Sequence, residues 1–413
     1  MLDQDTLNKN EVVIVGGGIV GMLLALSLDR LNIKTLAIEQ KPFEMLLNDN
    51  RSIALAYSSI CVLHSLGLWE DIKDTSAKIK QIHVSDKKAL SHVKLYAEEE
   101  SLPFLGAVVK ISVLLTVLLE RLKSCESVTL LSGYTCCSLS LDDQASSQHY
   151  TLGIKSLNTE AKVMYLMPKL IVAADGANSE LRKMADIAEK RHDYCQKAVV
   201  CDVSLKRDHG NWAYERFMTD GVLAMLPMAK NLVSSVWATT NDNADQLCEL
   251  SDEEFVKTLQ TEFGYRLGKI EKVSLRKSFP LSLVKADKLY QHNLLLFGNA
   301  AHFLHPVSAQ GLNLSIRDVA VLFDLIQEDN HLTSIPSLLD AYRLKRQKDH
   351  KRTAIITHEL MDLFTEDKLY SQKLRRLGMY FLERDRYLKR IFSQLMMGKM
   401  NYGASLMQKR LHK

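Results

Sequence analysis

Long apolar runs are missing from this chain. Its 413 residues contain no stretch of about 18 uninterrupted apolar residues, the length that a membrane-spanning helix needs. The opening segment, MLDQDTLNKN, is polar and lacks the apolar core of a signal peptide. We therefore expect a cytoplasmic protein without a spanning helix.

Cysteine patterns that bind zinc or build a disulfide framework are also missing. The chain has 7 cysteines, an odd number, and no C-x-x-C pair. Such a set predicts neither a disulfide-stapled domain nor a zinc site, so we predict reduced thiols and no bound metal. Cys136 and Cys137 are neighbours, and we interpret them as strand residues rather than as a redox pair.

A strong charge bias is absent as well. The 53 Lys and Arg residues nearly balance the 49 Asp and Glu residues, and no basic run is interleaved with aromatic residues. The resulting net charge of +4 argues against a nucleic-acid partner. The length and the ordinary composition, with 46% hydrophobic residues, predict a globular chain of two domains, which can be interleaved.

What the chain does have is a glycine-rich turn between a strand and a helix. Val12 to Val15 is a β-branched run typical of a strand buried on both faces, and Ile19 to Leu31 is an apolar helix pattern. Gly16, Gly18 and Gly21 between them have the G-x-G-x-x-G spacing, and a second strand, Thr35 to Ile38, ends at Glu39. These parts together predict dinucleotide binding, with the pyrophosphate at the helix N-terminus and Glu39 on a ribose.

The alternative is an ordinary glycine-rich turn without a ligand, which the complete strand, helix, strand and acid pattern disfavours. The fingerprint occurs once. A disulfide reductase that binds two nucleotides would show a second copy and a C-x-x-x-x-C motif near the first, and neither is present.

Two later segments repeat the pattern of a buried strand followed by small and polar residues. Lys169 to Ala174 leads into Asp175 and Gly176, and Leu294 to Phe297 leads into Gly298 and Asn299. Ligands of open α/β sheets gather at the carboxyl ends of parallel strands. A loop with Pro306 and Gly311 then enters a helix near Leu312, a second helix N-terminus that can hold a polar cofactor edge.

The remaining pattern predicts a second, antiparallel sheet. Three strand patterns follow one another without an intervening helix, which favours antiparallel pairing. These are Val199–Leu205, Val222–Met225 and Leu232–Thr239. Elsewhere the pattern predicts a helix over Ser52–Leu66, a hairpin from Gln81–Ser85 and His92–Tyr96, and a strand followed by a helix over Gly106–Leu122.

With these three motif regions in this order, the chain resembles the FAD-dependent aromatic monooxygenases of the para-hydroxybenzoate hydroxylase type over residues 10–370. Within them it is similar to the ubiquinone-biosynthesis hydroxylases, and the segments 215–228, 263–270 and 298–318 look most like the 2-polyprenyl-6-methoxyphenol hydroxylase branch. The resemblance implies an α/β fold in which a Rossmann-type FAD domain (10–75, 106–182 and 276–340) is interleaved with an antiparallel-sheet substrate domain (76–105 and 183–275). A C-terminal helical region, 341–413, follows.

The resemblance also implies roles for single residues. FAD contacts are expected from Gly16, Gly18, Gly21, Glu39, Arg51, Asp175, Gly176, Gly298, Asn299, Pro306, Gly311 and Leu312. An unremarkable surface arginine is the alternative for Arg51. The wider family usually has Asp where this chain has Asn299, which keeps an acceptor oxygen but loses the charge.

The implied chemistry is cofactor chemistry. NADH or NADPH reduces FAD, O₂ adds to give a C4a-hydroperoxyflavin, and its distal oxygen attacks a polyprenylated methoxyphenol ring. The protein must exclude water and help the phenol lose its proton. His302, His305 and Tyr214 are the candidates for that base, and packing or structural pairing is the alternative for each.

The lipophilic substrate raises the question of access. Arg384, Arg386, Lys389, Arg390, Lys399, Lys409, Arg410 and Lys413 lie in the last thirty residues, interspersed with apolar residues such as Phe392. This pattern predicts a basic amphipathic helix that contacts the inner membrane face or a partner enzyme, with a solvated tail as the alternative.

Other functions stay open at this point. The chain could catalyse another ring hydroxylation of the same pathway, act as a flavin oxidase or dehydrogenase on a different substrate, or serve mainly as a structural member of a quinone-synthesis complex.

Overall fold

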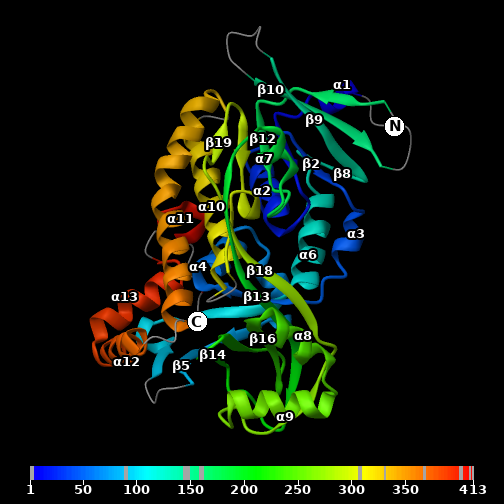
Figure 1. Ribbon diagram of the computed structural model, residues 1–413. Coiled ribbons are helices and arrows are strands. Elements are labelled where there is room, and N and C mark those ends of the chain that lie inside the picture. The colour runs from blue at the N-terminus through cyan, green and yellow to red at the C-terminus, as the bar shows by residue number, and fades with distance from the viewer. Residues whose placement is uncertain are drawn as a thin grey trace.

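The structure is a computed structural model that describes residues 4–87, 92–142, 149–157, 162–305, 309–329, 332–365, 369–399, 403–408 and 411. Figure 1 shows two bodies, one above the other. A parallel sheet covered by helices forms the upper body, and an antiparallel sheet forms the lower one. The chain crosses between the bodies several times, so that both are built from separated segments.

Among the described residues, six strands form the upper sheet in the order β19-β20-β12-β1-β2-β8. Their bounds are β1 (Val12–Val15), β2 (Thr35–Glu39), β8 (Val128–Ser132), β12 (Leu170–Ala173), β19 (Tyr290–Gln291) and β20 (Leu294–Leu296). All pairs are parallel except β19 with β20. Every residue of β1 and β12 is buried, which explains their continuous apolar sequences.

The turn between β1 and α2 (Ile19–Asp29) is held by very close backbone contacts. Gly16 has φ +116°, and a Cβ there would lie 2.3 Å from the carbonyl oxygen of Ala174. A Cβ on Gly21 would lie 2.0 Å from the carbonyl oxygen of Gly16. Only glycine fits at either place, and the predicted strand–helix–strand unit is confirmed.

Helices cover one face of this sheet and a small sheet covers the other. The helices are α2, α4 (Tyr57–Ser65), α6 (Ile111–Lys123), α10 (Gln310–Glu328) and α11 (Ile335–Thr365). Their apolar faces share one core, to which Leu23, Leu118 and Ile316 belong. The opposite face carries α7 (Glu180–Met184) and a sheet of β9 (Tyr134–Asp142), β10 (His149–Ser156) and β11 (Met164–Leu166).

The lower sheet has the order β21-β18-β13-β16-β15-β14-β5-β6 in the described chain, and β17 also pairs with β13. Its strands are β5 (Gln81–Asp86), β6 (His92–Tyr96), β13 (Glu189–Leu205), β14 (Trp212–Met218), β15 (Gly221–Pro227), β16 (Leu232–Thr240), β17 (Ile270–Val273), β18 (Lys277–Ala286) and β21 (His302–Phe303). Apart from the parallel pair of β14 and β5, all pairs are antiparallel. Helices α8 (Asn241–Glu249) and α9 (Asp252–Phe263) pack on it through Leu247 and Phe255. The predicted antiparallel sheet and hairpin are confirmed.

The helix predicted over Ser52–Leu66 is wrong in its first part. Ser52 to Ala56 forms strand β3, and α4 begins only at Tyr57. Strand β3 pairs with β7 (Gly106–Lys110), which also pairs with β4 (Ala77–Ile79). Pairing with a segment some fifty residues away therefore overrides the local helical pattern of this stretch.

The C-terminal helices lie beside both bodies. Helix α12 (Leu369–Arg384) packs against β6, and α13 (Arg386–Met396) follows it after Asp385, whose side chain caps α13. Figure 1 shows α12 and α13 at the lower left, next to β5. Within the described residues, none of the helices combines the length and apolarity that crossing a bilayer requires.

The close contact at Gly21 predicts a specific loss of stability. In Gly21→Ala the new methyl group overlaps the carbonyl oxygen of Gly16, so we expect the free energy of unfolding to fall by about 1–3 kcal/mol. Gly18→Ala is the matched control, because a Cβ on Gly18 meets nothing within 4 Å and its φ is −73°. Urea denaturation of both variants checks this, and equal losses would contradict it.

Candidate active site

The carboxyl ends of three neighbouring parallel strands open on one cavity. Val15 of β1 pairs with Ala173 of β12, and Ala173 pairs with Leu296 of β20. The glycine turn, the Asp175 segment and the Gly298 segment therefore meet at one edge of the sheet. The cavity there has a volume of about 750 Å³. Predicted site residues on its wall are Gly18, Gly21, Arg51, Gly176, Tyr214, Gly298, Asn299, His305, Gly311 and Leu312.

The first segment offers an uncapped helix N-terminus to the cavity. Gly18 is the N-cap of α2 and makes no side-chain cap, so N–H groups of the first turn are left for a ligand. Glu39 supports the turn from the end of β2, because Gly17 N donates to its Oε2 at 2.7 Å. Lys41 N donates to Oε1 at 3.0 Å, and the carboxylate retains acceptor capacity for a ribose hydroxyl.

The second segment supplies a buried carboxylate that is only half satisfied. Oδ2 of Asp175 accepts hydrogen bonds from Glu180 N at 2.9 Å and Leu181 N at 3.3 Å. Oδ1 is buried and has no hydrogen-bond partner among the described residues. Burial raises the pKa of Asp175. Asp175 itself is not among the cavity-lining residues, whereas Gly176 is, and its turn, with φ +89°, leaves open space where a side chain would lie.

The third segment adds another uncapped helix N-terminus. Gly298, with φ +58°, starts a short 3₁₀ turn that places Asn299 on the cavity wall. Helix α10 then begins after Ala309, which makes no side-chain cap, and its Gly311 and Leu312 also line the cavity. Pro306 lies outside the described residues, so its predicted place beside the flavin stays a prediction.

Arg51 lies at the cavity wall in a close ion pair. Its Nη2 is 2.5 Å from Oδ2 of Asp49, and its Nε is 2.9 Å from Oδ1. The guanidinium carbon lies 5.0 Å from the centre of the Phe279 ring, and the side chain is 48% exposed. The pair holds the arginine at the cavity, and its contact with FAD stays a prediction.

These features fit an elongated dinucleotide with an anionic centre. Two uncapped helix N-termini suit phosphate and polar ring edges, and Gly18 and Gly176 leave room where a side chain would intrude. The volume lies within the range of about 300–1,000 Å³ seen for small-molecule and cofactor sites.

Comparison with known proteins agrees with this geometry. The family model for the FAD binding domain matches residues 9–355. The chain belongs to the FAD-binding monooxygenase family. Ubiquinone hydroxylase UbiL of Rhodospirillum rubrum is 33% identical over 95% of this chain and 90% of its own length. The 3-demethoxyubiquinol 3-hydroxylase of Escherichia coli is 30% identical over 93% of this chain and 97% of its own.

Solved structures show the same fold. A probable FAD-dependent monooxygenase, pqsL of Pseudomonas aeruginosa, superposes with a TM-score of 0.74 at 20% identity, over 90% of this chain and 99% of that one. The predicted α/β fold and the membership of the ubiquinone-biosynthesis hydroxylases are confirmed, and FAD binding is supported. The nicotinamide reductant stays a prediction.

Two of the three candidates for the base that takes the proton of the phenol, His305 and Tyr214, lie on the wall of the cavity. His305 is fully buried, and burial lowers its pKa to about 4, so its ring is neutral at physiological pH and accepts a proton weakly. Burial raises the pKa of Tyr214, whose ring packs edge-on against Phe263 with centroids 5.3 Å apart. Both side chains are therefore neutral hydrogen-bonding groups at the cavity wall.

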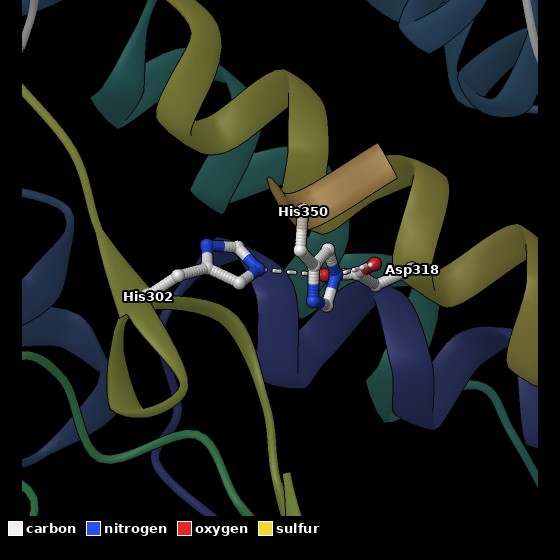
Figure 2. A group of neighbouring side chains, drawn as sticks. All are labelled: His302, Asp318 and His350. Atoms are coloured by element: carbon white, nitrogen blue, oxygen red, sulfur yellow. Dashed lines mark hydrogen bonds and ion pairs between the residues drawn. The ribbon is translucent and has the colours of Figure 1, made fainter. Parts of the chain in front are cut away.

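His302 turns away from the cavity to a buried carboxylate that the sequence analysis missed. Figure 2 shows the side chains of His302 and His350, each with a ring nitrogen directed at the carboxylate of Asp318. Nε2 of His302 lies 2.9 Å from Oδ2 of Asp318, and Nε2 of His350 lies 2.7 Å from Oδ1. Arg346 Nε donates to the same Oδ1 at 2.5 Å. Helices α10 and α11 and strand β21 are thus joined through Asp318.

This cluster, whose possible ligand atoms lie within 4.8 Å of one another, has the residue types of a metal site. The charges of the cluster disfavour a bound cation, because the permanently charged guanidinium of Arg346 already donates a hydrogen bond to the carboxylate of Asp318. Burial alone would raise the pKa of Asp318, but His350 and Arg346 outweigh burial and hold it well below the ordinary value. The arrangement fits a charged structural hub better than a cation site.

A signal for the hub exists in the sequence. The adjacent charges Arg317 and Asp318 interrupt the apolar pattern of α10, and both side chains are buried. Arg317 Nε donates to Oδ2 of Asp349 at 3.0 Å. Because buried charges are expected to be paired, the sequence could have indicated that Arg317 and Asp318 take part in a buried ion-pair network. It could not have indicated which residues are their partners.

The depressed pKa of His305 predicts a pH-dependent stability. As pH falls from about 6.5 to about 4, the unfolded state binds a proton at this residue that the folded state does not, so folding loses stability. Between about pH 7 and pH 5 the wild type should lose about 2 kcal/mol more than His305→Gln. Urea titrations at both pH values check this. Identical pH dependence of the two proteins would contradict it.

Proposed function

We propose that this chain hydroxylates the ring of a polyprenylated methoxyphenol in ubiquinone biosynthesis, with FAD as cofactor and NADH or NADPH and O₂ as cosubstrates. The observation that carries the proposal is the joint enclosure of one cavity by the three motif segments and by the substrate-side sheet. The names of two relatives, a ubiquinone hydroxylase and a demethoxyubiquinol hydroxylase, support the substrate class.

The residues on the cavity suggest how FAD would be held. The N-terminus of α2 at Gly18 would take the pyrophosphate, Glu39 the ribose, and Asn299 the ribityl chain. The N–H groups of Gly311 and Leu312 would face the pyrimidine edge. When bound and reduced, FAD would activate O₂, so that one oxygen atom goes to the ring and the other leaves as water.

The lower sheet provides the opposite wall, against which the phenol ring would lie. Most of its cavity-facing side chains are apolar, among them Val222, Ala224, Leu226, Val236 and Ala238, and Tyr214 and Glu215 add polar groups. Such a wall would bind an aromatic ring and exclude water, which protects the activated oxygen from unproductive decay.

His305 and Tyr214 would act as hydrogen-bonding partners of the phenol hydroxyl, because both are neutral at the cavity wall. His302 would act as a positioning residue, since its contact is with Asp318. Replacement of His302 by Ala should therefore reduce activity while FAD is retained.

A second candidate is another ring position on the same pathway, because the relative in Escherichia coli is named a 3-demethoxyubiquinol 3-hydroxylase. Quinone precursors that accumulate in cells lacking the protein would distinguish the two candidates.

Turnover tests the proposed reaction. Purified protein with FAD, NAD(P)H and a prenylated methoxyphenol should give one hydroxylated product for each reductant consumed. Gly18→Asp places a carboxylate at the uncapped helix N-terminus, where it would repel the pyrophosphate, so we expect bound flavin and turnover to disappear together. Release of H₂O₂ without any hydroxylated product would contradict the proposal.

We also propose that α12 and α13 rest on an anionic membrane surface. Their exposed residues combine rings and aliphatic chains with charge: Leu377, Tyr380, Phe381, Tyr387, Leu388, Arg384, Arg386 and Arg390. Tyr387 is 73% exposed. Apolar residues flanked by arginines are the composition of a helix that lies in a lipid interface. Lys389 is not part of this face, because it is buried against Glu99 and Glu383.

Vesicle binding tests the membrane face. Each basic residue near an anionic surface contributes about 1 kcal/mol, so Arg386→Glu/Arg390→Glu should bind phosphatidylglycerol vesicles at least about tenfold more weakly. Lys155→Glu/Lys272→Glu changes the net charge equally on exposed strand residues elsewhere and should bind like the wild type. Equal co-sedimentation of all three proteins would remove the proposal.

A further inference from the structure

A second cavity, of about 530 Å³, lies between the lower sheet and the C-terminal helices. One wall comes from β5, β6 and β14, and the other comes from α12 and α13. Apolar lining side chains include Ile82, Val84, Val93, Leu95, Phe217, Met379, Leu382, Ile391, Phe392 and Met396. The polar side chains on its wall are Glu215, Gln310, Asn313 and Ser393.

This cavity adjoins the flavin-side cavity. Ala54, Ile79, Ile82, Glu215 and Ala309 line both. A ligand whose ring lies against the lower sheet in the first cavity can therefore extend an attached chain past these residues into the second. At the far side, Gly378, Phe381 and Leu388 line the second cavity and are also exposed to solvent.

The helical wall is fastened to the rest of the protein. Glu383 of α12 accepts a hydrogen bond from Lys94 N of β6 at 2.9 Å. Nζ of Lys389 on α13 lies 3.4 Å from Oε2 of Glu99 and 3.6 Å from Oε2 of Glu383. Gln310 Nε2 donates to the carbonyl of Met396 at 3.1 Å. These polar contacts hold α12 and α13 in place against the sheet, so the cavity between them is already present before any ligand binds.

We propose that the second cavity binds the isoprenoid tail of the substrate, with the exposed opening at Gly378, Phe381 and Leu388 as its entrance. The inference rests on the proposed function for the identity of the tail. An apolar chain gains by leaving water for such a wall, which offers few polar partners. A cavity of this size accommodates a few isoprene units, and a longer tail continues through the entrance toward the face of α12 and α13.

Ser393 provides a direct test of occupancy. Its side chain is 3% exposed and lines the cavity, and its hydroxyl has no hydrogen-bond partner among the described residues. Ser393→Phe puts a ring into the cavity, whereas Ser393→Ala removes the hydroxyl without adding volume. The exposed Ser140→Phe on β9 adds the same ring away from both cavities.

The measurement is equilibrium dialysis of tritiated farnesol against the purified, FAD-loaded full-length proteins. We expect the wild type, Ser393→Ala and Ser140→Phe to bind farnesol equally within about twofold, and Ser393→Phe to bind at least about tenfold more weakly. Absence of binding by the wild type, or unchanged binding by Ser393→Phe, would overturn the proposal.

A second variant, Gly378→Leu, tests the proposal even where Ser393→Phe fails to fold. A Cβ on Gly378 would meet no atom within 4 Å, and a helix tolerates leucine better than glycine, so Gly378→Leu should fold and narrow the entrance. We expect it to weaken farnesol binding several-fold, and unchanged binding by a folded Gly378→Leu would count against the proposal. Because dialysis involves no turnover, wild type that binds farnesol but hydroxylates no prenylated phenol would refute the proposed function and leave the tail site supported.

Discussion

The structure depends first on the parallel pairing of β1, β12 and β20. These strands come from positions separated by more than a hundred residues, yet their registers align Val15, Ala173 and Leu296 side by side. Because parallel strands end at the same edge of a sheet, this pairing alone brings three polar and glycine-bearing turns together. The buried apolar residues of the strands make the pairing stable, and the cavity at this edge of the sheet is a consequence of it.

A second constraint joins the helical layer to that edge. Asp318 accepts hydrogen bonds from His302 of β21 and from Arg346 and His350 of α11, all in the buried interior. Removing one partner from such a network leaves an uncompensated buried charge, so its members hold one another in place. Strand β21 is thereby tied to α10, whose N-terminal residue Gly311 lines the cavity.

Much of the upper body could be predicted from local patterns. The turn from Gly16 to Gly21 carries its own explanation, since the contacts that demand glycine lie between near neighbours or adjacent strands. The strand Ser52–Ala56 could not be predicted, because its partner Gly106–Lys110 is distant and the local pattern favours a helix. The same limit applies to β14, which pairs with β5 across more than a hundred residues.

The candidate site likewise contains residues that local patterns predict and residues whose placement depends on distant contacts. Residues that face the cavity through backbone geometry, such as Gly18 and Gly298, follow from motif spacing. The orientation of His302 does not, because its partner Asp318 lies on a helix whose packing is set by tertiary contacts. The second cavity exists only where α12 and α13 meet the lower sheet, and no local pattern encodes that contact.

Joint enclosure of FAD by the three segments can be measured by hydrogen–deuterium exchange of flavin-free and FAD-loaded protein. Simultaneous protection of amides in residues 16–21, 174–177 and 298–304 on FAD binding is the result that this account predicts. Protection confined to one of these segments, or spread over none of them, would contradict it.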